Sequence, residues 1–215
     1  TSYRAALRLQ PNYPETHYNL GVSLAQLGAL PEAIGHYEAA LRLQPDYPAA
    51  HNNFANALVR VDRVPEALHH YETAVRLDPA FAEAHGNLGN ALLQNGQAEA
   101  SVGCFTRALA LKPESAESHY NLGNAYAALD RMPAALGEYR AALRLRPDYA
   151  DAHVNAGNAL LQLGRAGEAV AAYERDHERF VAELIKLTEI PAPPFGEGPR
   201  AKAYMAMLKD AGLEG

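Results

Sequence analysis

Hydrophobic and polar positions along the chain follow the period of short amphipathic helices. In one segment His85 is followed by apolar or small residues at Leu88, Gly89 and Leu92, which is the i, i+3, i+4, i+7 spacing of one helix face. A second kind of segment carries Ala-x-x-x-Tyr-x-x-Ala, for example over residues 135–142. The pattern predicts an all-α chain of helix pairs joined by tight turns.

The helix pairs repeat every 34 residues, and several residue types keep the same step. Prolines stand at Pro11, Pro45, Pro79, Pro113 and Pro147. Histidines stand at His17, His51, His85, His119 and His153. Five equally spaced positions without an insertion leave little room for coincidence, so the sequence predicts a tandem array of helix–turn–helix units.

The break inside each unit predicts a turn that ends the first helix. It falls at residues that tolerate the left-handed conformation: Gly28, Asp62, Gly96, Asp130 and Gly164. Three residues later Pro31, Pro65 and Pro133 suit the start of the second helix. The proline of the 34-residue period then ends that helix, because proline lacks an N–H and disfavours helix in the residue before it.

These residues resemble the tetratricopeptide repeat family over about residues 1–174, although histidine stands where that family usually has a large aromatic residue. The resemblance implies a right-handed superhelical solenoid. Small residues would let the paired helices approach: Gly21, Ala55, Gly89, Gly123 and Gly157. An aromatic column would fill the space between the helices: Tyr37, Tyr71, Phe105, Tyr139 and Tyr173.

The period predicts three segments. Residues 1–11 match only the second helix of a preceding repeat, so the chain is expected to start within a repeat. Residues 12–174 are expected to hold five repeats, at about 14–47, 48–81, 82–115, 116–149 and 150–174. Residues 175–215 do not repeat and are expected to form a long helix extension, a proline-rich loop and a short helix.

The tail has two interpretations. A repeat array needs a cap over its last apolar face, and a helix after Tyr173 would supply one. Alternatively, residues 178–215 look like the opening of di-zinc exopeptidases of the aminoacylase/carboxypeptidase type, chiefly through Leu-Thr-Glu-Ile-Pro-Ala-Pro-Pro-Phe-Gly-Glu at 187–197. The metal ligands and catalytic glutamate of that family would lie beyond Gly215, so this resemblance implies no peptidase chemistry in the chain.

Two asparagine columns mark the predicted binding face, which the family resemblance places on the concave side. The first column is Asn19, Asn53, Asn87, Asn121 and Asn155. The second is Asn56, Asn90, Asn124 and Asn158, three residues further on and therefore on the same helix face. Each carboxamide offers a donor and an acceptor, so the columns could pair with the backbone of an extended peptide.

The arrangement resembles the repeat domain of O-linked N-acetylglucosamine transferases, whose inner asparagine ladder holds substrate peptides. The alternative is that the amides bond neighbouring helices and stabilise the stack.

Acidic residues stand four positions before the first asparagine column, at Glu15, Glu83, Glu117 and Asp151. If they face the groove they would favour neutral or basic peptides; the alternative is that they stabilise the helix dipole. The predicted peptide-binding set comprises both asparagine columns with Glu83, Glu117, Asp151, Tyr18 and Tyr120.

Charge and composition limit the kinds of partner that the chain is expected to bind. The net charge of −6 argues against nucleic acid or an anionic membrane as the partner. The single cysteine, Cys104, excludes an internal disulfide and favours a reducing, cytoplasmic setting. No apolar run approaches the roughly 18 residues of a membrane helix.

Nothing in the motifs predicts catalysis, a cofactor or a metal. Equivalent histidines in stacked helix pairs would lie about 8–10 Å or more apart, whereas zinc–nitrogen bonds are about 2.0–2.1 Å. The sequence therefore predicts a non-enzymatic scaffold that binds a peptide or partner segment in an asparagine-lined groove. Two alternatives stay open: a non-catalytic arm of a larger glycosyltransferase or di-zinc peptidase, and a self-assembly module that forms a homo-oligomer through its ends or tail.

Overall fold

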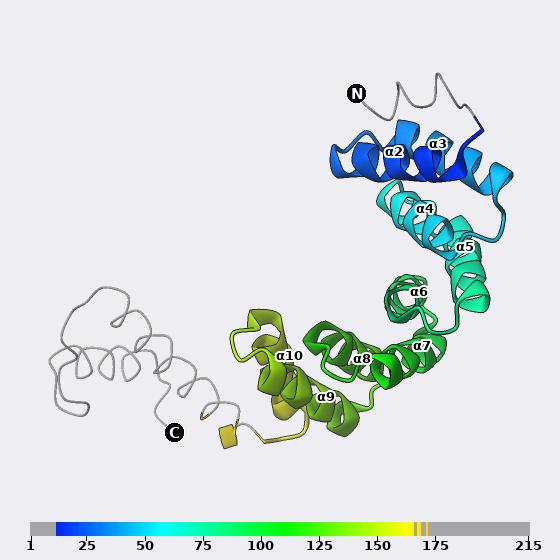
Figure 1. Ribbon diagram of the computed structural model, residues 1–215. Coiled ribbons are helices and arrows are strands. Elements are labelled where there is room, and N and C mark those ends of the chain that lie inside the picture. The colour runs from blue at the N-terminus through cyan, green and yellow to red at the C-terminus, as the bar shows by residue number, and fades with distance from the viewer. Residues whose placement is uncertain (1–11, 166, 169–170, 172–215) are drawn as a thin grey trace, which may run out of the picture. The chain divides into compact units, whose positions relative to one another are not determined.

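The computed structural model describes residues 12–165, 167–168 and 171, and these residues form nine α-helices and no strand (Figure 1). The first helices of the pairs are α2 (Pro14–Gln26), α4 (Pro48–Arg60), α6 (Ala82–Gln94), α8 (Ala116–Ala128) and α10 (Ala150–Gln162). The second helices are α3 (Leu30–Leu43), α5 (Val64–Leu77), α7 (Ala98–Leu111) and α9 (Met132–Leu145). The all-α prediction is confirmed.

The chain divides into two compact units, residues 1–152 and 153–215, and the boundary lies inside α10. In the first unit each helix from α2 to α9 packs against the next one in sequence. The first helices of successive pairs also contact each other, α2 with α4, α4 with α6 and α6 with α8. The helices that carry the asparagine columns therefore form one continuous layer in this unit.

The turns inside the pairs have the predicted left-handed backbone. Positive φ occurs at Gly28 (79°), Asp62 (61°), Gly96 (76°), Asp130 (57°) and Gly164 (70°). The next N–H reaches back to a carbonyl five residues earlier, from Ala29 to Leu24 and from Arg63 to Leu58, both at 2.9 Å. These bonds satisfy carbonyls that the end of the helix leaves without partners.

The paired helices close around the predicted aromatic column. Tyr37, Tyr71, Phe105 and Tyr139 are all buried, with at most 3% of their surface exposed. A Cβ atom added at Gly21, Gly89 or Gly123 would lie 2.5–2.8 Å from a ring carbon of the aromatic residue in the same pair. Ala55 takes the equivalent place in the second repeat and is fully buried. The small residues therefore set the spacing of the helices, as predicted.

Several predictions lie outside the described residues. They concern the half-repeat at 1–11, Tyr173 with the second helix of the fifth repeat, and the tail at 175–215. None of the described helices is both long and apolar enough to cross a membrane.

We expect Gly123→Ala to lower the free energy of unfolding by about 1–3 kcal/mol, because the new methyl would lie 2.5 Å from the Tyr139 ring. Gly137→Ala on α9 is the matched control, since a Cβ there meets nothing within 4 Å. It should raise stability by about 0.5–1 kcal/mol. Urea unfolding followed by circular dichroism measures both, and equal effects would contradict the packing argument.

Candidate functional site

Part of the first asparagine column bonds one repeat to the next. Asn53 donates from Nδ2 to the Tyr18 hydroxyl at 2.9 Å, and Asn87 donates from Nδ2 to Asn52 Oδ1 at 3.0 Å. Donor and acceptor are 35 residues apart in both cases. Each bond therefore joins one first helix to its successor, as the stack-stabilising interpretation expects.

Asn52 connects these bonds into one network. It is buried, and its Nδ2 donates to Asn53 Oδ1 at 3.3 Å and to Glu83 Oε1 at 3.4 Å. Burial and the Glu83 carboxylate raise the pKa of Tyr18, which keeps its hydroxyl protonated. Asn52 is not predictable from the repeat pattern, because the equivalent positions hold Tyr18, Gly86, Tyr120 and Val154 and form no column.

The second asparagine column bonds within a repeat. The Tyr71 hydroxyl donates to Asn56 Oδ1 at 2.6 Å, and the Tyr139 hydroxyl donates to Asn124 Oδ1 at 2.9 Å. Burial raises the pKa of Tyr71, so it remains a donor. The carbonyls of Asn56 and Asn124 are thus used by the aromatic column of the core.

Both kinds of bond are interrupted where the third repeat meets the fourth. Phe105 has no hydroxyl to offer Asn90, and Gly86 has no side chain to accept from Asn121 in the way that Tyr18 accepts from Asn53. Among the residues that the structure describes, the amides of Asn90 and Asn121 have no hydrogen-bond partner, and both side chains are half-buried. Their donors and acceptors are open to a ligand.

A cavity of about 220 Å³ lies at this junction. Its walls bring together five predicted site residues: Glu83, Asn87, Asn90, Glu117 and Asn121. Gly86 and Ser115 also line it. A wider recess of about 940 Å³ shares Lys112, Ser115 and Glu117 with it, but no asparagine lines that recess.

The other predicted residues lie apart from this cavity. Asn19 is half-buried on α2, and the Tyr120 ring packs against the Tyr149 and Tyr139 rings, with centroids 4.8 and 5.9 Å away. Asp151 is exposed at the start of α10. Asn155 is half-buried and Asn158 exposed, both on the part of α10 that belongs to the second unit.

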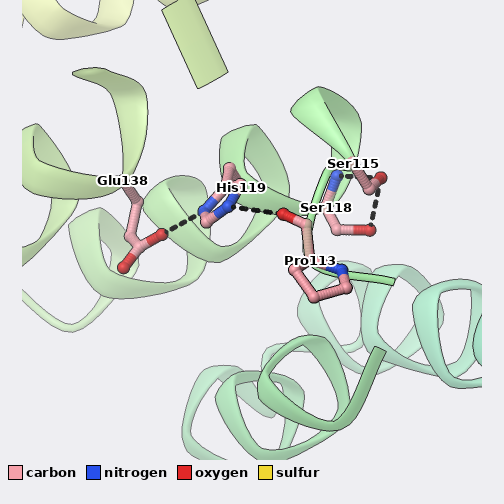
Figure 2. A network of polar contacts seen from close by, with 5 residues as sticks. All are labelled: Pro113, Ser115, Ser118, His119 and Glu138. Carbon is pink, nitrogen blue, oxygen red and sulfur yellow. Dashed lines mark hydrogen bonds and ion pairs between the residues drawn. The ribbon is translucent and has the colours of Figure 1, made fainter. Parts of the chain in front are cut away.

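The histidine column connects neighbouring segments through hydrogen bonds. Nε2 of a histidine lies close to the carbonyl of the proline six residues earlier in three repeats, namely His51 with Pro45 (2.9 Å), His85 with Pro79 (3.2 Å) and His119 with Pro113 (3.2 Å). Nδ1 lies close to a side chain on the second helix, namely His17 with His36 (3.0 Å), His51 with His70 (2.9 Å) and His119 with Glu138 (2.7 Å). Figure 2 shows the His119 case. No group of three or more metal-binding side chains occurs in the described part of the chain.

Cys104 is half-buried on α7 and packs against the core. Burial raises the pKa of its thiol to about 11. Because the thiolate is the reactive form, this cysteine has the character of a packing residue and not of a nucleophile.

A family model for the tetratricopeptide repeat matches residues 1–48, 87–150 and 120–178, and a TPR repeat model matches residues 62–96. No curated protein shows a significant sequence match.

Several solved structures share the fold. A MamA crystal structure is 23% identical, with a TM-score of 0.74 over 84% of this chain and 97% of its own. YrrB, a TPR protein with an unusual peptide-binding site, is 21% identical, with a TM-score of 0.72 over 83% of this chain and 92% of its own. MamA from Desulfovibrio magneticus RS-1, from residue 41 to its end, is 19% identical, with a TM-score of 0.72 over 77% and 93%.

Acid is expected to destabilise the fold through the His51–His70 pair. Burial, reinforced by His51 and His69, lowers the pKa of His70 to about 4, below the value of about 6.5 of an unfolded histidine. The stability that the neutral ring contributes is therefore complete above about pH 6.5 and falls as the pH drops toward 4. Melting temperatures measured across this range should fall more steeply for the parent chain than for His70→Gln. Parallel curves would contradict the prediction.

Tyr71→Phe is expected to lower the free energy of unfolding by about 0.5–1.5 kcal/mol, because it removes the hydroxyl bonded to Asn56. Phe105→Tyr makes the reverse exchange and should raise stability, because the new hydroxyl reaches Asn90. Urea unfolding of both variants measures whether stability falls in Tyr71→Phe and rises in Phe105→Tyr. A loss of stability in Phe105→Tyr would show that Asn90 is not placed like Asn56.

Proposed function

The chain belongs to the tetratricopeptide repeat family, and from that premise we propose that it is a non-catalytic scaffold that binds an extended segment of another polypeptide along the layer of its first helices. The observation that carries the proposal is the cluster of open amides at the cavity between the third and fourth repeats. Asn90 and Asn121 offer donors and acceptors there that no described residue uses.

Carboxamides suit an extended peptide because each peptide residue presents one N–H and one C=O that need partners. Such pairing tolerates many side chains, since it reads the backbone. The exposed carboxylates of Glu83 and Glu117 on the same cavity would favour a neutral or basic segment. YrrB shares the fold and has an unusual peptide-binding site, which supports peptide binding as the function proposed for this chain.

The likeness to the asparagine ladder of O-linked N-acetylglucosamine transferases enters this proposal only at Asn87, Asn90 and Asn121. Asn53 serves the stack instead, and Asn56 and Asn124 serve the core. The peptidase-like tail, the enzyme-arm alternative and assembly through the ends depend on residues outside the described part. A cytoplasmic location and the exclusion of nucleic acid and membranes rest on charge and composition.

Binding of capped, extended peptides of varied charge tests the proposal. The double variant Asn90→Ala, Asn121→Ala should weaken binding about tenfold or more, because each lost hydrogen bond contributes about 0.5–1.5 kcal/mol. Its fold should persist, since neither amide bonds to a described residue. Asn95→Ala, at an exposed amide in the turn after α6, is the control and should leave the affinity unchanged.

Circular dichroism of each variant separates loss of binding from loss of structure. The proposal fails if the parent chain binds none of the peptides, or if the folded double variant binds them as well as the parent does.

A further inference from the structure

Large side chains fill most of the places on the first-helix layer that correspond to Gly86 and Ser115. The positions equivalent to Gly86 hold Tyr18, Asn52, Tyr120 and Val154. The positions equivalent to Ser115 hold Tyr13, Tyr47, Phe81 and Tyr149. Two corresponding pairs of rings pack together, Tyr18 with Tyr47 at 5.0 Å between centroids and Tyr120 with Tyr149 at 4.8 Å.

The exchange of two rings for Gly86 and Ser115 explains why the cavity lies where it does. Both residues line it, and a Cβ atom added at Gly86 would meet nothing within 4 Å. Ser115 turns its oxygen to the start of α8, where it accepts from the Ser118 N–H at 3.1 Å (Figure 2). The volume of about 220 Å³ is below the roughly 300–1,000 Å³ of small-molecule sites, so it suits one side chain better than a separate ligand.

The polar groups of the cavity match a phenol. In the first repeat pair the Tyr18 hydroxyl accepts from Asn53 Nδ2 at 2.9 Å, and Asn121 is the equivalent donor at the cavity. In the second and fourth repeats a tyrosine hydroxyl donates to Asn56 and Asn124, and Asn90 is the equivalent acceptor. The cavity therefore holds one donor and one acceptor, and the equivalent groups in other repeats pair with tyrosine hydroxyls.

We propose that the cavity between the third and fourth repeats binds a tyrosine side chain presented by the extended partner segment. Its ring takes the place that Tyr18 and Tyr120 fill at their own junctions. Its hydroxyl accepts from Asn121 Nδ2 and donates to Asn90 Oδ1. An aromatic ring with a polar end combines large apolar burial with a specific hydrogen bond, which makes it an effective anchor. This inference rests on the proposed function and adds the residue that the groove selects.

The first test uses capped peptides of glycine, serine and lysine that differ only at a central tyrosine, phenylalanine or alanine. Fluorescence anisotropy should show the tyrosine peptide binding about tenfold or more tightly than the alanine peptide, because a buried ring is gained. It should bind about two- to tenfold more tightly than the phenylalanine peptide, because the hydroxyl is paired.

Variants test whether the preference for the tyrosine peptide depends on the cavity. Gly86→Tyr refills the cavity with the residue of the first and fourth repeats and should abolish the preference for tyrosine over alanine. Gly103→Tyr is the matched control, because Gly103 is exposed on α7 and an added Cβ meets nothing within 4 Å. Asn121→Ala should remove the preference for tyrosine over phenylalanine and keep the preference for either over alanine.

The outcomes separate the two proposals. Equal binding of all three peptides to the parent chain would overturn the tyrosine site and leave the peptide scaffold standing. A tyrosine preference that survives in folded Gly86→Tyr would also overturn it. If Gly86→Tyr does not fold, Asn121→Ala decides, and an unchanged preference for tyrosine over phenylalanine overturns the site. Failure of every peptide to bind the parent chain would sink the scaffold proposal and the tyrosine site together.

Discussion

In the first, third and fourth repeats an aromatic ring from the second helix lies so close to a glycine of the first helix that no larger side chain would fit there. At Gly89 an added Cβ would come within 2.7 Å of the Phe105 ring. This contact brings the helix axes close enough for a tyrosine hydroxyl to cross the pair and reach an asparagine of the first helix, as Tyr139 reaches Asn124. The polar surface of the first-helix layer thus depends on an apolar contact in the core.

The amide groups of the asparagine columns can bond either to the rest of the fold or to a ligand, and both uses need the same atoms. An amide whose carbonyl accepts from a core tyrosine, or whose nitrogen donates to the previous first helix, has less to offer a ligand. Buried polar groups must be paired, so amides between packed helices form hydrogen bonds within the fold. In the described residues, open amides and a cavity occur together where the repeat departs from its own pattern, at Gly86, Phe105 and Ser115. Three replacements in one neighbourhood open both the amides and the space beside them.

The histidine column also connects different parts of the repeat through hydrogen bonds. The His51 and His119 rings each lie between a proline carbonyl at the end of the preceding repeat and a side chain on their own second helix, so each joins three segments. The His51–His70 pair achieves this with two rings that share one proton, which requires that they not both be charged. This junction therefore needs at least one neutral imidazole, and burial, reinforced by His51 and His69, lowers the pKa of His70.

The sequence by itself determined the helix pairs, the left-handed turn residues, the aromatic column and the small residues beneath it. All of these follow from local conformational preference and from a period that recurs along the chain. Only the tertiary structure decided which asparagines remain open, and it revealed Asn52 and the cavity at Gly86. The physical reason is that these features depend on hydrogen bonds between residues 15 or 35 positions apart and on the side chain that happens to stand opposite. Periodicity places Asn53 and Asn121 in one column, whereas the neighbour across the helix interface makes one a structural bond and the other an open amide.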